Sequence, residues 1–328
     1  MIRANRRHVI KALSAAMPFV CLPPWARAQD KYPSRPVMLI VPQPVGGDAD
    51  VICRTLQPKM QAVLGQPVVI DNRGGAGGNI GTALGAKAAP DGYTVTFVNQ
   101  GTMALNPTLY TNPGYRVDDL IPVTWLTSID LVIAAHPSVP AHDLREFLEL
   151  ARKAPGRYSY GTAGNGSANH LAGEMLKSMA GVDLLHVPYK GGGPAIIAAL
   201  GGEISAVVAF PLAALPHIRS GRLKALAVTG TSRSKALPDV PTVAESGVAG
   251  YAFSSWMGLT VPKGTPDPIV QAIHEAASTA LKDPEVVERL SSGMTEPVGA
   301  GPEAFAEQIA RETARWSGMI EKFGMRLD

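Results

Sequence analysis

The sequence predicts an α/β protein of two domains with mostly parallel strands. Short apolar runs alternate with amphipathic stretches along the chain, as in folds where a helix follows each strand. The 328 residues exceed the roughly 100–200 that one domain usually holds, so two domains are expected. The hydrophobic share of 46% is enough for packed cores and excludes a disordered chain.

The first set of elements lies between residues 37 and 98. Apolar runs predict three strands, at Val37–Val41, Val68–Ile70 and Thr94–Val98. Two helices are expected between them, at Asp48–Leu64 and Ile80–Ala88. In the first helix apolar residues recur every four positions along one face, at Ile52, Leu56, Met60 and Leu64.

A second set of alternating elements begins at residue 131. Apolar runs predict strands at Leu131–Ala135, Tyr158–Tyr160, Leu184–Val187, Ile204–Val208 and Leu223–Val228. Helical spacing of apolar residues predicts helices around Leu144–Ala151, Leu171–Met179, Pro194–Leu200 and Leu212–Ser220.

The last third of the chain predicts a return to the first set. A strand is expected at Phe253–Val261, followed by helices at Asp267–Leu281 and Pro302–Phe323. In the last helix an apolar face for packing is formed by Phe305, Ile309, Trp316 and Ile320. One domain is therefore expected to be discontinuous, from 29–133 and 255–328, with 134–254 inserted and a hinge where the chain crosses near Ala134 and Ser255.

Residues 1–28 have the pattern of a secretory signal. Arg3, Arg6 and Arg7 form a basic start, Ala12–Leu22 is apolar, and Ala26-Arg27-Ala28 is a small-x-small cleavage site. The apolar run is shorter than the roughly 20 residues of a membrane-spanning helix. Cleavage after Ala28 and a location in a bacterial periplasm are expected. The adjacent arginines fit a twin-arginine route as well as an ordinary secretory one.

Charge and cysteine content exclude two classes of protein. Residues 1–28 hold five of the 30 basic residues and no acidic one, which leaves 25 basic and 27 acidic residues, a net charge of −2. A strongly basic nucleic-acid-binding protein is therefore not expected. Only Cys53 lies beyond residue 28, so an intramolecular disulfide is excluded there. Its helical spacing among apolar residues predicts a buried side chain rather than a catalytic thiol.

Two glycine-rich junctions, Pro42–Asp50 and Tyr160–His170, share one design. Each follows a predicted strand and opens a predicted helix. Glycines let a ligand approach the backbone, and the first turn of a helix offers unpaired N–H groups. Such a terminus favours an anion by roughly 0.3–1 kcal/mol, and by up to about 2 kcal/mol when partly buried. Hydroxyls of Thr162 and Ser167 would add donors.

Either junction alone also fits an ordinary connection. Asp48 or Asp50 would then cap the first helix and Ser167 the second. Because the two junctions fall in different domains, they favour an anion site that both domains share. A third junction, His186–Gly193, places Tyr189 and Lys190 at the start of a helix, but its lysine precedes the glycines and so departs from a P-loop.

Familiar enzyme motifs are missing from the sequence. It contains no H-E-x-x-H, C-x-x-C, G-x-S-x-G or G-x-x-x-x-G-K pattern, and no two histidines have metal-ligand spacing. A hydrolase or isomerase using Ser167, His170 and Asp50 is the alternative from another class. Without a nucleophile elbow, packing explains His170 better than catalysis. No enzyme, metal or cofactor is expected.

Several motifs together resemble one receptor family. They are Tyr32-Pro33-Ser34-Arg35-Pro36, Gly46-Gly47 with Asp50, Asn72-Arg73 with Gly77–Gly81, Ala89–Tyr93, Tyr160–Gly173, His186–Gly192 and Leu237–Thr242. In this order they are similar to the tripartite tricarboxylate transporter substrate-binding, or Bug, receptor family. The resemblance implies a two-lobed type II periplasmic binding protein fold with a central cleft and two hinge crossings. Members close around small carboxylates and deliver them to a membrane permease of one large and one small subunit.

The resemblance also implies which residues bind the ligand. All but Phe210 are carried over position by position. With Phe210 added they are Gln43, Pro44, Gly46, Gly47, Asp48, Asp50, Asn99, Gln100, Gly101, Thr162, Ala163, Gly164, Asn165, Gly166, Ser167, His170, Tyr189, Lys190 and Phe210. A monomer that binds a small organic acid and no nucleic acid is expected. A receptor that docks on a sensor kinase would have the same sequence features.

The first loop departs from the family pattern F-P-P-G-G-x-[ST]-D. Gln43 stands for the Phe, Val45 for the second Pro, and Asp48-Ala49 for a small or hydroxyl pair, while Ala209-Phe210 stands where many members have Asp-Asn. Asp48 would repel a ligand carboxylate unless it points away as a cap, and Phe210 would offer an apolar face. We therefore expect a ligand other than a citrate-like polyanion. It would be a monocarboxylate with an aromatic body, or one with an amine or hydroxyl group facing Asp48.

Overall fold

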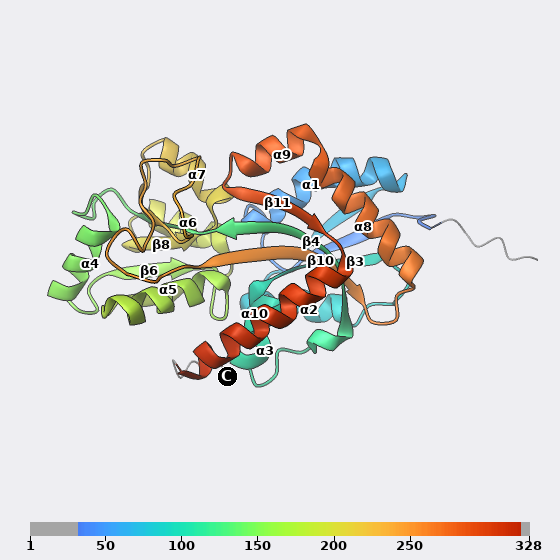
Figure 1. The fold of residues 1–328 in the computed structure, drawn as a ribbon, viewed down its shortest axis with the longest axis horizontal. Coiled ribbons are helices and arrows are strands. Elements are labelled where there is room, and N and C mark those ends of the chain that lie inside the picture. Colours follow the sequence, from blue (N-terminus) through green and yellow to red (C-terminus); the bar gives the residue numbers. More distant parts are fainter. Residues whose placement is uncertain (1–31, 323–328) are drawn as a thin grey trace, which may run out of the picture. The chain divides into compact units, whose positions relative to one another are not determined.

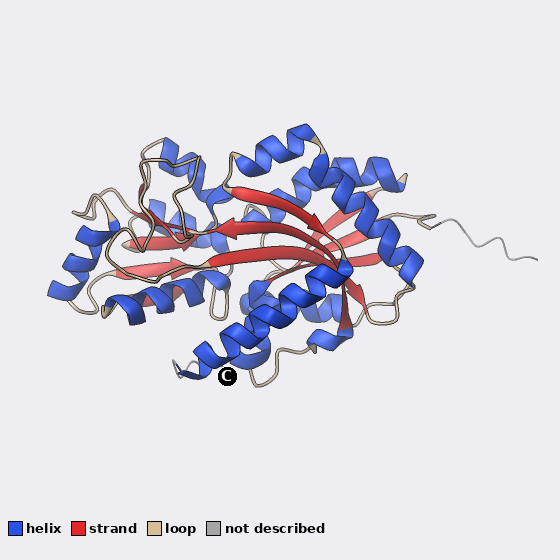
Figure 2. Cartoon of the chain, in the orientation of Figure 1, coloured by secondary structure: helices blue, strands red, loops and turns tan. Residues whose placement is uncertain are grey.

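A computed structural model describes residues 32–322, which form two mixed sheets covered by helices (Figures 1 and 2). The expected signal segment, residues 1–28, lies outside the described residues. The larger sheet has the order β11-β4-β10-β3-β1-β2 and the smaller one the order β7-β6-β8-β5-β9. We call the parts built on these sheets lobe 1 and lobe 2.

Lobe 1 combines the first and last parts of the described chain. Its strands are β1 (Val37–Val41), β2 (Val68–Asn72), β3 (Thr94–Asn99), β4 (Leu120–Asp130), β10 (Ser254–Pro262) and β11 (Thr295–Ala300). Its helices are α1 (Asp48–Leu64), α2 (Asn79–Ala86), α3 (Asn106–Leu109), α8 (Asp267–Lys282), α9 (Pro284–Ser291) and α10 (Pro302–Lys322).

Lobe 2 uses the residues between β4 and β10. Its strands are β5 (Val132–Ala135), β6 (Ser159–Thr162), β7 (Leu185–Pro188), β8 (Ala206–Ala209) and β9 (Lys224–Val228). Its helices are α4 (Leu144–Lys153), α5 (Ala168–Ala180), α6 (Gly192–Leu200) and α7 (Pro211–Arg219). None of the helices within residues 32–322 is both long and apolar enough to cross a membrane.

The expectation of mostly parallel strands is wrong. Strand β1 pairs in parallel with β2 and β3, and β6 with β7 and β8. All other pairs are antiparallel: β10 with β3 and β4, β11 with β4, and β5 with β8 and β9. Two parallel neighbours must be joined by a crossover connection, usually a helix. Strands β5 and β10 instead enter their sheets where the chain crosses from the other lobe, and each runs antiparallel to its neighbours.

The chain crosses between the lobes at two neighbouring points. β4 ends at Asp130, β5 begins at Val132, and β10 returns alongside β4, with Ser254 opposite Asp130 (Figure 1). Between the two crossings lies the buried Thr229, whose Oγ1 accepts from Leu131 N and donates to Phe253 O, both at 2.8 Å. One hydroxyl therefore ties both crossings together.

The packing predictions for single residues are confirmed. Phe305, Ile309, Trp316 and Ile320 on α10 are all buried, and so is Cys53. Strand β4, helix α9 and strand β11 were not expected from the sequence. The strand β4 carries Thr124, Thr127 and Ser128 among its apolar residues, and its 11 positions alternate only irregularly between buried and half-buried.

The contact between Gly258 on β10 and Phe305 on α10 gives a test of this packing. A Cβ at Gly258 would overlap the Phe305 ring and lie 2.7 Å from the carbonyl oxygen of Thr124. We expect Gly258→Ala to lower the free energy of unfolding by about 1–3 kcal/mol, as overpacking does. Gly318→Ala on α10 is the control: a Cβ there meets no atom within 4 Å, so it should stabilise by roughly 0.5–1 kcal/mol. Urea denaturation measures both, and equal effects would contradict the packing.

Candidate functional site

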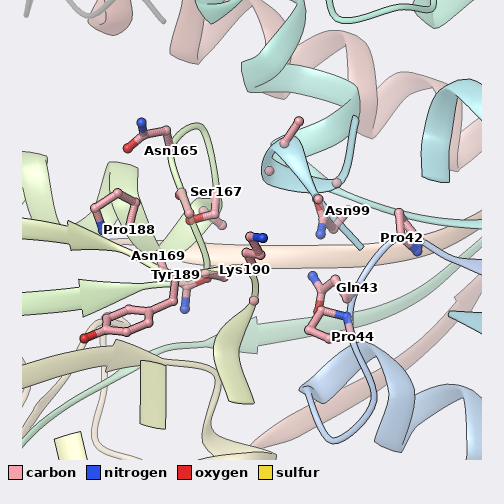
Figure 3. A pocket seen from close by; sticks show the side chains of 18 of the residues that line it. Pro42, Gln43, Pro44, Asn99, Asn165, Ser167, Asn169, Pro188, Tyr189 and Lys190 are labelled. Atoms are coloured by element: carbon pink, nitrogen blue, oxygen red, sulfur yellow. The ribbon is translucent and has the colours of Figure 1, made fainter. Parts of the chain in front are cut away.

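A cavity of about 250 Å³ lies where connections of both lobes meet (Figure 3). Lobe 1 contributes Pro42–Pro44 after β1, Gly75–Gly78 before α2, Asn99 at the end of β3, and Tyr110 after α3. Lobe 2 contributes residues from the connection between β6 and α5 and from the first turn of α5, Pro188–Gly191 from the end of β7 to the start of α6, and Phe210 after β8. These are mostly the carboxyl ends of strands, where α/β sheets commonly bind ligands.

About half of the residues expected to bind ligand line this cavity. They are Gln43, Pro44, Asn99, Ala163, Gly164, Asn165, Ser167, Tyr189, Lys190 and Phe210. The others belong to the same connections but are not among the lining residues: Gly46, Gly47, Asp48, Asp50, Gln100, Gly101, Thr162, Gly166 and His170.

Ten further lining residues were not among the expected ligand-binding residues, although five of them lie in the three junctions predicted from the sequence. They are Pro42, Gly75, Ala76, Gly77, Gly78, Tyr110, Ala168, Asn169, Pro188 and Gly191. The glycines before α2 repeat the design of the two selected junctions, a glycine-rich turn between a strand and a helix, so that design could have found them. Tyr110 has no such signal, because it follows the short helix α3 rather than a strand.

Three helices begin at the cavity. The N-cap residues of α2, α5 and α6 are Gly78, Ser167 and Gly191, and each of them lines it. First-turn N–H groups lack partners within their own helix and carry the positive end of the helix dipole. The cavity therefore has the electrostatics of an anion site.

The charged side chains around the cavity also favour a positive potential. Lys190 is the only Lys, Arg, Asp or Glu among its described lining residues. In Figure 3 the Lys190 side chain lies between Ser167 of lobe 2 and Gln43 of lobe 1. The amides of Gln43, Asn99 and Asn169 supply neutral donors and acceptors, and Phe210 supplies an apolar wall.

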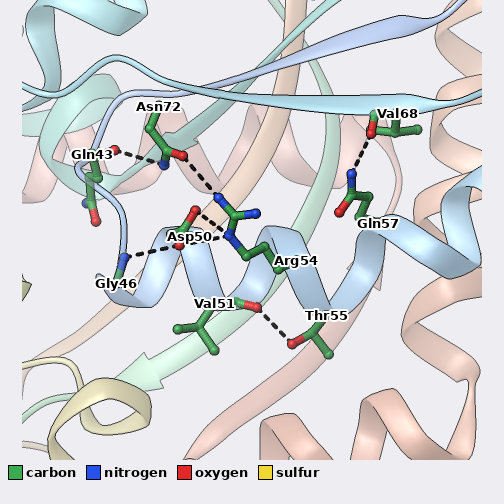
Figure 4. Close-up of polar contacts among 9 residues, drawn as sticks. All are labelled: Gln43, Gly46, Asp50, Val51, Arg54, Thr55, Gln57, Val68 and Asn72. Atoms are coloured by element: carbon green, nitrogen blue, oxygen red, sulfur yellow. Dashed lines mark hydrogen bonds and ion pairs between the residues drawn. The ribbon is translucent and has the colours of Figure 1, made fainter.

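The loop between β1 and α1 is held by side chains of its own lobe (Figure 4). Asn72 Nδ2 donates to Gln43 O at 3.1 Å, and Gly46 N donates to Asp50 Oδ2 at 3.1 Å. Arg54 Nε donates to Asp50 at 3.0 Å. Burial alone would raise the pKa of Asp50, but these hydrogen bonds lower it overall. Asp50 thus shapes the loop from behind, away from the cavity.

The alternative in which Asp48 or Asp50 caps α1 is not supported. The N-cap residue is Gly47, without a side-chain hydrogen bond, and Asp48 turns towards lobe 2. There its Oδ1 accepts from Ala213 N at 2.8 Å. Asp48 is buried and does not line the cavity, so the structure gives no support to a ligand amine or hydroxyl that faces it.

The loop between β6 and α5 uses its hydroxyls internally. Ser167 caps α5 by accepting from His170 N at 3.2 Å, as predicted, and its Oγ donates to Gly164 O at 2.7 Å. Thr162 Oγ1 lies 2.7 Å from His186 Nε2, and Gly166 N donates to His170 Nδ1 at 3.3 Å. The two imidazoles stack with centroids 4.1 Å apart. His170 packs and braces this loop.

The lobes also contact each other at the cavity. Tyr110 OH of lobe 1 donates to Asn165 O of lobe 2 at 2.9 Å. Gly191 lies so close to Pro44 that a Cβ there, already strained by its φ of +127°, would overlap the proline ring. Connections of the two lobes are thus in direct contact at two places beside the cavity.

The imidazole stack predicts a pH effect on stability. Burial, together with the neighbouring His170, lowers the pKa of His186 from 6.5 to about 3. Its contribution to stability is therefore full above about pH 6.5 and is lost as the pH falls towards 3. Between pH 7.5 and pH 5 the free energy of unfolding should fall more for the natural chain than for His186→Gln, because glutamine does not titrate. An equal fall would show that His186 is not the group responsible.

Solved structures of known proteins share this fold. A structure described as periplasmic binding protein BugD is 36% identical, with a TM-score of 0.86, covering 90% of this chain and 99% of that one. Rpa4515 of Rhodopseudomonas palustris with adipate is 32% identical (TM-score 0.87, 90% and 99% covered). MatC of the same organism with bound malate is 33% identical (TM-score 0.84, 88% and 100% covered). The predicted two-lobed α/β binding-protein fold is confirmed.

The family comparison agrees with these structures. The model of the tripartite tricarboxylate transporter family receptor matches residues 52–325, most of the chain. The proteins that this chain resembles are solute-binding receptors, not enzymes. The chain therefore belongs to the tripartite tricarboxylate transporter receptor family.

Proposed function

We propose that this chain is a periplasmic receptor that captures a small organic carboxylate between its lobes and delivers it to a tripartite permease with one large and one small membrane subunit. The observation that carries the proposal is the cavity itself. Three helix N-termini and Lys190 meet there, and no carboxylate side chain stands among its described lining residues. The similar chains that hold adipate and malate support an organic acid as the ligand.

The size of the cavity sets the scale of the ligand. Its volume of about 250 Å³ is below the roughly 300–1,000 Å³ of sites for drug-sized molecules. A metabolite-sized acid fits this scale. Phe210 and the single cation Lys190 favour an acid with an apolar or aromatic body and few carboxylates over a citrate-like polyanion.

Capture works through closure of the lobes. We propose that the hinge lies at the two crossings tied by Thr229, between β4 and β5 and just before β10, within a few residues of the boundaries expected from the sequence. An acid in the cavity finds its donors in both lobes only when they are closed. Binding therefore shifts the open–closed equilibrium by the difference in affinity for the two forms. The closed form then presents one continuous surface to the permease.

Location and export follow from the same proposal. The receptor acts in the periplasm as a monomer after removal of a signal peptide, with cleavage after Ala28. N-terminal sequencing of the protein recovered from the periplasm tests this, and a mature chain that begins at Gln29 is the expected result.

Calorimetric titration of the purified protein tests the binding function. We expect one-to-one binding of at least one acid from a panel of adipate, malate, citrate and aromatic monocarboxylates, with the acid recovered unchanged. An absence of binding across the panel would argue against the function. If citrate binds most tightly, the ligand class proposed from Phe210 and Lys190 is wrong.

A matched pair of lysine variants tests the site. Lys190→Met should weaken binding of the best acid roughly tenfold, because a charge-assisted hydrogen bond is lost. Lys235→Met, an exposed lysine in lobe 2 outside the cavity, should leave the affinity unchanged. Equal affinities for both variants would place the acid elsewhere.

A further inference from the structure

Asp48 makes a hydrogen bond between the lobes that the ligand site does not require. It is the first residue of α1 in lobe 1, and only 3% of it is exposed. Its Oδ1 accepts from Ala213 N, in the first turn of α7 in lobe 2, at 2.8 Å. The two residues are 165 positions apart in the sequence.

The start of α7 lacks a cap of its own. Its N-cap residue is Phe210, whose side chain cannot accept a hydrogen bond, and Pro211 has no N–H. The amides of Leu212 and Ala213 are the first that need an acceptor, and Ala213 N donates to Asp48. An Asp normally caps the helix it precedes, whereas this one caps a helix of the other lobe.

Packing around this contact is close. Leu212 of α7 lies against Gly293 of lobe 1 so tightly that a Cβ at Gly293 would overlap it. At the other end of α7, Arg219 Nη2 donates to Ser292 O of lobe 1 at 3.0 Å. These contacts hold α7 against lobe 1 along its length, and moving α7 away from α1 would expose the buried Asp48 carboxylate to water.

We propose that Asp48 is a cross-lobe helix cap, a positioning residue that stabilises the closed form because it can accept the N–H groups of α7 only while the lobes are together. The inference rests on the proposed closure of the receptor. It adds a contact that acts without any ligand, so it can be tested separately.

The surroundings of Asp48 make this cap sensitive to pH. Its Oδ2 is buried without a hydrogen-bond partner among the described residues, and burial raises its pKa from 3.8 to about 7, against the hydrogen bonds from Ala213 and Leu212. An Asp48 exposed by opening would return to its ordinary value. Closing therefore takes up a proton between about pH 4 and pH 7, and the closed form loses stability as the pH rises through that range, by up to tenfold per unit.

Several charged groups on the elements around Asp48 are engaged with other partners. On α1, Asp50 pairs with Arg54. On α7, His217 bonds to Arg222 and Arg219 to Ser292 O. On α9, Arg289 donates to Thr55 Oγ1. At the crossing, Asp130 also has a raised pKa, from burial, and it accepts from Ser254. A variant at Asp48 itself is therefore needed to isolate its share of any pH effect.

Three variants of the full receptor test the cap without any added acid. Asp48→Ala removes the acceptor, Asp48→Asn keeps an acceptor oxygen but cannot titrate, and Asp267→Asn changes an exposed acid at the same position of α8. Hydrogen exchange of the Leu212 and Ala213 amides reports the cap. X-ray scattering at pH 5 and pH 7.5 reports the open–closed ratio.

At pH 5, where the closed form holds Asp48 protonated, we expect Asp48→Ala to reduce the closed-to-open ratio about fivefold and to speed exchange at Ala213, as loss of a cap acceptor does. Asp48→Asn should keep the slow exchange and reduce the pH dependence of scattering by the share that Asp48 contributes. Asp267→Asn should match the natural chain in both measurements.

The cap is refuted if Asp48→Ala lowers the melting temperature while scattering stays unchanged, or if Asp48→Asn keeps the full pH dependence. Titration of the same variants with adipate and malate reports the proposed function independently. A natural chain that binds neither acid, yet shows the cap, would leave this inference standing and count against the function.

Discussion

The pairing of β4 with β10 is the constraint on which the cavity depends. These strands carry the chain between the lobes side by side, and Thr229 joins the crossings with one buried hydroxyl. Because both crossings lie at one place, the connections at the strand ends of each sheet face each other. A cavity lined from both lobes follows from this arrangement, and so does the direct contact of Tyr110 with Asn165 O.

Each loop at the cavity is held from behind by its own lobe. Asp50 and Asn72 hold the first loop, and Ser167 and His170 hold the second. Their side chains therefore fix the backbone, which leaves the starts of the helices to face the cavity. This division explains why residues such as Asp50 and His170 lie beside the cavity without lining it. Their removal would act on binding through the shape of the loops.

Many local features of this fold could be predicted from the sequence, and so could the return of the chain near Phe253–Val261 to the first set of strands, but the contacts between the lobes could not. Val37–Val41 and Asp48–Leu64 have the bounds that apolar periodicity predicts, and the glycine-rich junctions lie at the cavity. Strand β4 escapes prediction because its buried Thr124 and Thr127 break the apolar pattern. The partner of Asp48 escapes for another reason: nothing near residue 48 indicates that a helix 165 positions later lacks a cap.

The positive potential of the cavity depends on the orientation of two acidic side chains, Asp48 and Asp50. Asp48 and Asp50 lie within a few residues of Gln43 and Pro44, which line the cavity, so either carboxylate facing inwards would oppose an anion. Arg54 and Gly46 N donate to the carboxylate of Asp50, and Ala213 N at the start of α7 donates to Asp48. With both acids withdrawn, Lys190 and three helix termini set the potential. The contact that holds Asp48 against α7 therefore favours closure and, by the same geometry, keeps a negative charge out of an anion site.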